Sequence, residues 1–203
     1  YGGKLSNVAL FNSALISSQV QTLYNNGTPE TSISHSPVSW YKLDNTTTGV
    51  QDSAGSNNGT NNGATEYAGF VNALSGYSVC MDSSNLVVSD LTKTSGYSPY
   101  ALDFDGSNDY LNCGNDSIFQ ITGAMTVSYW FNGQGGSGTV GGFEKLSGSN
   151  NRGFCLGLNN NNNITFYIAP TVNSLVSASY SHTTDNDWHH LLGVFTPSTS
   201  LEL

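Results

Sequence analysis

Residues 184–195 contain more potential metal ligands than any comparable stretch of the chain, with two aspartates, two adjacent histidines and a tryptophan in TDNDWHHLLGVF. A zinc site needs several such side chains that converge on one ion. If the segment is a strand, successive side chains point to opposite faces, so His189 and His190 cannot easily bind the same ion. We therefore interpret Asp185 to Asp187 as a turn and the residues after it as a strand that Trp188 anchors in the core.

A second group of candidate ligands is formed by three aspartates in the sequence DFDGSND. Asp103 and Asp105 share one face of a predicted strand, and the glycine-containing turn that follows brings Asp109 back towards them. Carboxylate oxygens are the hard ligands that calcium prefers, so these three residues predict a calcium site, and calcium is the one candidate cofactor. The alternative is that Asp105-Gly106 and Asn108-Asp109 are simply turn formers.

Catalytic chemistry has little support in the sequence. Glycoside hydrolysis needs a pair of neighbouring carboxyl groups. None of the glutamates lies two positions from another acidic residue; they are Glu30, Glu66, Glu144 and Glu202. The chain also contains no nucleophile elbow, P-loop or HExxH motif. We therefore predict that the protein is not an enzyme.

The balance of charges excludes several classes of partner. Five Lys and Arg residues stand against fourteen Asp and Glu residues, which gives a formal net charge of −9. Nucleic-acid binding depends on basic side chains that neutralise phosphates, so nucleic acid is not an expected partner. An anionic membrane surface is disfavoured for the same reason. No run of about eighteen apolar residues is present, so we expect no membrane insertion.

Alternating hydrophobicity predicts strands over most of the chain. The clearest case is MTVSYWF, residues 125–131, which places Met125, Val127, Tyr129 and Phe131 on one face. Further strands are predicted at residues 100–104, 153–158 and 164–169. The large aromatic residues expected in the core are Trp40, Phe104, Trp130 and Trp188.

One helix is predicted near the N-terminus, over residues 17–27. Val20, Leu23 and Tyr24 form its apolar stripe, and Ser18 with Gln21 has the spacing of a capping box. Gly27 stands where a left-handed residue would end the helix. Residues 31–37 follow as a linker.

Three segments together resemble the concanavalin A-like, laminin G-like jelly-roll family: ALDFDGSNDYLNCGN, MTVSYWFNG and DWHHLLGVF. Strands of these types recur in this order in that family, and the resemblance runs over roughly residues 38–203. It implies an all-β fold, a concanavalin A-like (laminin G-like) antiparallel β-sandwich with one short helix near the N-terminus.

The N-terminal residues are similar to the part of the same family that normally closes a domain, its final strand and helix. We therefore divide the chain into a closing strand and helix at 1–30, a linker at 31–37 and a β-sandwich at 38–203 that lacks its C-terminal strands. Two accounts fit this order. Either the chain is a window cut from a tandem array, which we favour, or the closing segment completes the sandwich of 38–203 within the chain or in a neighbouring subunit.

The resemblance implies a lectin-like module, and the Asn-rich, weakly charged sequence is similar to tandem laminin G-like segments in structural proteins of marine bacteriophages. We expect glycan recognition or adhesion to a host cell surface, with a location on a virion or outside the cell. The candidate ligand-binding aromatic residues are Tyr67, Tyr77, Tyr97 and Tyr180, for which ordinary loop packing is the alternative. The other functional hypothesis is a purely structural spacer or assembly module, completed by strand donation between neighbouring copies, without a sugar ligand.

Overall fold

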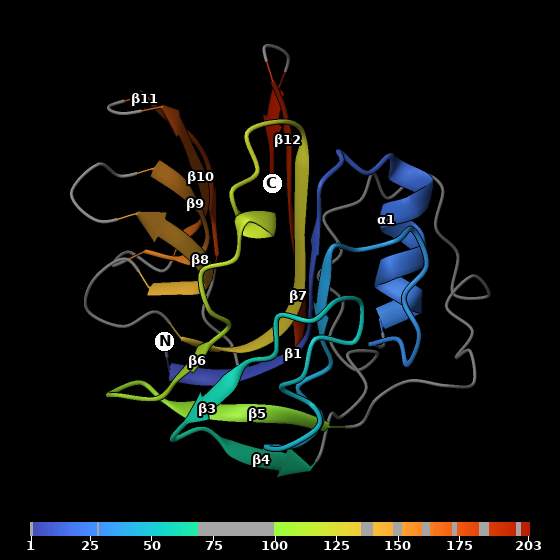
Figure 1. Cartoon of the computed structure of the whole chain (residues 1–203), viewed down its shortest axis with the longest axis vertical. Helices are drawn as coiled ribbons and strands as arrows, with labels where there is room; N and C mark the ends of the chain where they lie inside the picture. Colours follow the sequence, from blue (N-terminus) through green and yellow to red (C-terminus); the bar gives the residue numbers. More distant parts are fainter. Residues whose placement is uncertain are drawn as a thin grey trace.

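In the residues that the structure describes, the chain forms an antiparallel β-sandwich with one α-helix packed on its outside (Figure 1). The computed structural model describes residues 2–27, 29–68, 100–134, 140–147, 152–159, 163–171, 174–182, 187–197 and 200–203. Within these ranges the strands form a seven-stranded sheet, a four-stranded sheet and a two-stranded ribbon. This architecture confirms the predicted fold class.

The larger sheet has the order β13-β12-β7-β1-β5-β4, and β2 pairs with β1. Its strands are β1 (Gly2–Phe11), β2 (Ser39–Tyr41), β4 (Thr65–Ala68), β5 (Tyr100–Asp105), β7 (Met125–Gln134), β12 (His189–Thr196) and β13 (Ser200–Glu202). The smaller sheet has the order β11-β10-β9-β8. Its strands are β8 (Val140–Ser147), β9 (Arg152–Leu158), β10 (Asn163–Thr171) and β11 (Ser174–Ser181). The ribbon joins β3 (Thr60–Asn62) to β6 (Tyr110–Asn112).

The main core lies between the two sheets. Val127, Tyr129 and Phe131 of β7 are buried against the smaller sheet, because every second side chain of the strand points inward. Phe166 of β10 packs directly over Gly193, where an added Cβ would lie 2.7 Å from the phenyl ring. Each large apolar side chain buried in this way contributes about 1.5 to 3 kcal/mol to folding.

The opposite face of the larger sheet is covered by α1 (Ser17–Tyr24). Here Leu23 of the helix packs with Phe11 and Trp40 in a second cluster. A third cluster joins Trp130 and Trp188, and the ring of Tyr24 stacks on Trp130 with 5.7 Å between centroids. The four aromatic residues expected in the core are all buried; they are Trp40, Phe104, Trp130 and Trp188.

The predicted helix is present and begins at Ser17 as predicted, but its α-helical part ends before Gly27 and a different residue caps its first turn. Its last helical residue is Tyr24, and Asn25 adopts the left-handed conformation with φ of 43°, which asparagine tolerates better than most residues. A short 3-10 turn, η1 (Asn25–Gly27), follows. At the other end, Gln19 Oε1 accepts a hydrogen bond from the Ile16 backbone N–H at 2.9 Å, so Gln19 supplies the cap expected from Ser18 and Gln21.

The N-terminal strand β1 lies inside the larger sheet, between β7 and β5. Its register pairs Gly2 with Asp105 on β5 and with Gln134 on β7. Residues 2–11 therefore complete the sheet formed by the later strands of the same chain, which is one of the two arrangements considered above. The division of the chain into domains, and its place in any tandem array, stay predictions.

Candidate functional site

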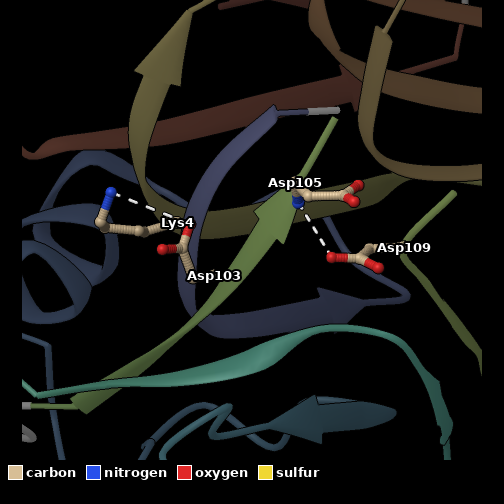
Figure 2. A network of polar contacts seen from close by, with 4 residues as sticks. All are labelled: Lys4, Asp103, Asp105 and Asp109. Carbon is tan, nitrogen blue, oxygen red and sulfur yellow. Dashed lines mark hydrogen bonds and ion pairs between the residues drawn. The ribbon is translucent and has the colours of Figure 1, made fainter. Parts of the chain in front are cut away.

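The aspartates of the predicted calcium site fall into two separate contacts (Figure 2). Asp105 and Asp109 shape the turn after β5. Asp105 Oδ1 accepts hydrogen bonds from the backbone N–H groups of Ser107 and Asn108 at 2.7 and 3.3 Å, and Asp109 Oδ2 accepts one from the Asp105 N–H at 2.9 Å. Both carboxylates therefore stabilise the turn at residues 105–109, as the turn-forming residues of this segment predict.

Asp103 contacts a different group of residues. Its Oδ1 lies 3.8 Å from Lys4 Nζ of β1, and the same ammonium lies 4.8 Å from the centre of the Tyr67 ring. Within the described ranges, no three His, Cys, Asp or Glu side chains are grouped to hold one metal ion. The structure therefore brings Asp105 and Asp109 together and pairs Asp103 with Lys4, and calcium binding stays a prediction.

The two histidines at the start of β12 lie on opposite faces of the larger sheet, as strand alternation predicts. The His189 ring contacts the core residue Phe131, with 5.4 Å between ring centres. The His190 ring stacks on Trp130 at 4.9 Å on the other face, and its Nε2 lies 2.8 Å from Ser128 Oγ. Burial under α1 lowers the pKa of His190 to about 4, so this imidazole is neutral at physiological pH and has a packing role.

The β3–β6 ribbon has one polar face that includes an aromatic residue. Its cross-strand pairs are Thr60 with Asn112 and Asn62 with Tyr110, and paired residues share a face. The Tyr110 side chain is 56% exposed. The intervening residue Leu111 points the other way and packs on the main core. An exposed ring is thus flanked by two asparagines and a threonine.

Each of the two asparagines on this face uses one of its two polar groups in a hydrogen bond to the backbone. Asn62 Nδ2 donates to the Thr60 carbonyl at 3.1 Å, and Asn112 Oδ1 accepts from the Gly114 N–H at 2.9 Å. These bonds fix the two side chains and leave the amide oxygen of Asn62 and the amide nitrogen of Asn112 without a hydrogen bond in the described part of the chain. The face therefore offers one acceptor and one donor beside the Tyr110 ring.

The ribbon is held in place by the turn and loop beside it. Gly63 follows β3 with φ of +97°, and an added Cβ there would overlap the Asp109 carboxylate. At the other end of β3, the Gly59 N–H donates to the Val50 carbonyl at 2.8 Å. An added Cβ at Gly59 would lie 2.8 Å from the Val50 carbonyl oxygen, so a side chain at either glycine would push the ribbon away from its support.

The supporting loop is organised by one buried carboxylate, Asp52, which is 7% exposed. It accepts five hydrogen bonds, from Ser39 Oγ and from the backbone N–H groups of Trp40, Ala54, Gly55 and Asn57. Burial alone would raise the pKa of Asp52, but these bonds outweigh it and hold the pKa below the ordinary 3.8. Asp52 is therefore ionised and fixes the loop from which β3 starts.

The tyrosines predicted from sequence do not gather at one site. Tyr67 packs beside the cluster of Trp130 and Trp188 and lies under Lys4, so its ring is largely covered. Tyr180 of β11 is 52% exposed. Tyr77 and Tyr97 lie outside the described residues. Sequence reasoning missed Tyr110 because it assigned this residue only to a family motif; its position among Asp109, Asn108 and Asn112 was the available signal.

Residues 105–203 match the family model of the concanavalin A-like lectin/glucanases superfamily, in its laminin G-like branch. The match covers 99 of the 203 residues, and over this segment the chain is similar to members of that superfamily. The match confirms the predicted family over these residues, which include the ribbon strand β6, the neighbouring strands β7 and β12 of the larger sheet and all four strands of the smaller sheet. No curated protein and no solved structure matches the chain. Among the described residues, no helix is long and apolar enough to cross a membrane.

Proposed function

We propose that this laminin G-like chain is a non-enzymatic, lectin-like module that binds glycans on the exposed face of the β3–β6 ribbon. The observation that carries the proposal is the exposed Tyr110 ring, on the same face of the ribbon as Thr60, Asn62 and Asn112. The superfamily name includes lectins, which is consistent with this role. Fold-level analogy alone would be a limited argument, so the proposal depends on the ribbon.

The chemistry of the face suits a sugar ring. The polarised C–H groups on one side of a pyranose can stack on the electron-rich face of Tyr110. Sugar hydroxyls both donate and accept, and they can pair with the Asn62 amide oxygen and the Asn112 amide nitrogen. Neighbouring Asp105 and Asp109, together with the net charge of −9, favour a neutral glycan over a sialylated or sulfated one.

The setting that fits these properties is a surface structural protein, on a phage virion or outside a cell. The low content of charged residues, 9%, and the Asn-rich loops are those of the phage proteins that the sequence resembles. Host-surface glycans are the corresponding partner. Catalysis is not part of the proposal, because Asp105 and Asp109 are occupied in shaping their turn and Glu66 Oε1 accepts bonds from the Thr46 N–H and hydroxyl at 3.0 and 3.1 Å.

A glycan array followed by titration calorimetry tests this function. We expect binding of a neutral glycan, about tenfold weaker in Tyr110→Ala and retained in Tyr110→Phe, since loss of a stacked ring costs about 0.5 to 1.5 kcal/mol. Tyr180→Ala is the matched control, because Tyr180 is similarly exposed but lies on a different sheet. Binding that is lost in Tyr180→Ala and kept in Tyr110→Ala would contradict the ribbon site, and the absence of any glycan ligand would contradict the function.

The second candidate function is a structural assembly module without a sugar ligand. It is favoured by the interior position of β1, which shows that the first strand of the chain supplies backbone partners to β5 and β7. A protein of this kind would bind no glycan on the array and would still form ordered assemblies.

A further inference from the structure

The segment of residues 2–27 carries two surfaces that complete the rest of the sandwich. Its strand β1 pairs on one side with β5 and on the other with β7. Leu5, Val8 and Leu10 of this strand are buried in the main core. Without β1, both neighbouring strands would present unpaired backbone groups, and three apolar side chains would be missing between the sheets.

The second surface of the segment is the inner side of α1. Leu23 of α1, together with Leu15 just before the helix, packs in one cluster with Trp40 of β2, and Tyr24 stacks on Trp130 of β7. Strand and helix therefore dock on the same body at two places, one through sheet pairing and one through side chains. A segment that docks in this way needs only the following strands, whichever copy of the chain supplies them.

The connection from this segment to β2 is strained. His35 and Ser36 have φ of 73° and 51°, so two successive residues other than glycine occupy the left-handed region. Such a conformation costs L-residues about 1 to 2 kcal/mol each. Pro37 follows and restricts the backbone of Ser36 further.

Two side-chain polar atoms of the same connection are buried without a hydrogen-bond partner in the described residues. Glu30 Oε2 and His35 Nε2 have no hydrogen-bond partner in the described part of the chain. Burial raises the pKa of Glu30, which reflects the cost of keeping this carboxylate away from water. A straightened connection would return both groups to solvent and would release the left-handed pair.

We propose that residues 2–27 exchange between two copies of this chain, with residues 29–38 as the hinge, so that β1 and α1 of each copy complete the sandwich of the other. A second copy is the natural partner because its later strands offer the same register and the same side-chain contacts. Strained hinge connections favour such exchange, since the closed form alone bears the strain. Ten extended residues span about 35 Å, enough to reach a neighbouring sandwich.

A disulfide trap distinguishes exchange from ordinary association. Lys4 of β1 is directly opposite Asn132 of β7, and the Cβ atoms of opposed residues lie about 4.5 to 5.5 Å apart, close enough for a disulfide after a small backbone adjustment. Lys4→Cys with Asn132→Cys is refolded at high concentration, the dimer fraction is isolated by size-exclusion chromatography, oxidised and run on a non-reducing denaturing gel. Asn132→Cys alone is the control for the native cysteines. We expect a covalent dimer in the double variant only.

Other outcomes of the trap overturn the proposal. A dimer fraction that runs as a monomer on the gel would show that each β1 stays in its own sandwich. If no dimer forms at any protein concentration, the proposed exchange does not occur.

The hinge is tested by glycine substitutions. His35→Gly with Ser36→Gly removes the left-handed strain from the closed monomer, so the dimer dissociation constant should rise about tenfold or more. Ser32→Gly with Ser34→Gly is the matched control, because both serines are exposed in the same connection and have ordinary φ values. An equal change of the dissociation constant in both double variants would show that left-handed strain does not drive the exchange.

Discussion

Replacement of Asp52 tests whether one buried carboxylate holds the loop behind the candidate glycan site. Asn preserves the size of the side chain but changes one acceptor oxygen into an NH2 group and removes the charge. The retained oxygen can still accept from the Trp40, Ala54 and Gly55 N–H groups that now meet Oδ1. The new NH2 group would face Ser39 Oγ and the Asn57 N–H, which now donate to Oδ2 at 2.7 and 3.3 Å.

The expected loss of stability follows from these contacts. Hydrogen bonds to a charged group contribute about 1.5 to 3 kcal/mol and neutral ones about 1, so three retained bonds lose roughly 3 kcal/mol together. The Ser39 hydroxyl can turn and accept from the new NH2 group. The Asn57 N–H loses its long bond of 3.3 Å, and removal of the buried charge offsets part of these losses. We therefore expect Asp52→Asn to lower the free energy of unfolding by about 2 kcal/mol, and Asp52→Ala by about 4 kcal/mol because it leaves backbone N–H groups without partners.

The pH dependence gives this prediction a distinctive sign. Because the pKa of Asp52 in the folded protein lies below 3.8, its ordinary value, the carboxylate stabilises the fold above that pH and loses its contribution as the pH falls through the folded pKa. Urea unfolding followed by tryptophan fluorescence, repeated from neutral pH to about pH 2, should show wild type and Asp52→Asn converging only below pH 3.8. Asp116→Asn, at an exposed cap, is the control and should change stability by less than about 0.5 kcal/mol. A difference between wild type and Asp52→Asn that is unchanged across the range would refute the role of the charge.

Two further outcomes are expected. Trp188→Ala should lower the free energy of unfolding by about 3 to 5 kcal/mol in chemical denaturation, because Trp188 is buried with Trp130, and near-wild-type stability would remove it from the core. If the turn after β5 binds calcium, added calcium should raise the melting temperature of the wild type, and Asp105→Asn with Asp109→Asn should abolish that rise; a calcium response that survives in the double variant would reject the site.

The sequence predicts those features that depend on local periodicity. The alternation in MTVSYWF and DWHHLLGVF specifies which side chains face the core, since the side-chain period of a strand is two. Val127, Phe131 and His189 accordingly lie on one face of the sheet, and Trp130 and His190 on the other. The same alternation explains why two adjacent histidines do not form a metal site.

Features that depend on distant contacts could not be predicted in this way. Asp52 lies in a polar, Asn-rich loop, and nothing in its immediate sequence identifies it as the acceptor for Ser39 and Trp40, which precede it by more than ten residues. The position of β1 between β5 and β7 is likewise a long-range choice, because pairing partners are selected by the complete sheet. The place of Tyr110 beside Thr60 and Asn62 also depends on β6 pairing with β3 across a wide separation in sequence, although the Asn and Asp residues around Tyr110 are a local signal of an exposed polar position.

The interior strand also connects the two proposals. Gly2 of β1 pairs with Asp105, the residue whose carboxylate and N–H organise the turn into β6 and Tyr110. In an exchanged pair, each ribbon would therefore be supported by a strand from the other copy. Such a pair carries two glycan-binding faces in one particle, and a second binding event within one particle can strengthen attachment by about a hundredfold or more when the surface presents many identical sugars. Weak recognition of a neutral sugar by a single Tyr110 would then be sufficient for adhesion, because assembly through β1 supplies the remaining affinity.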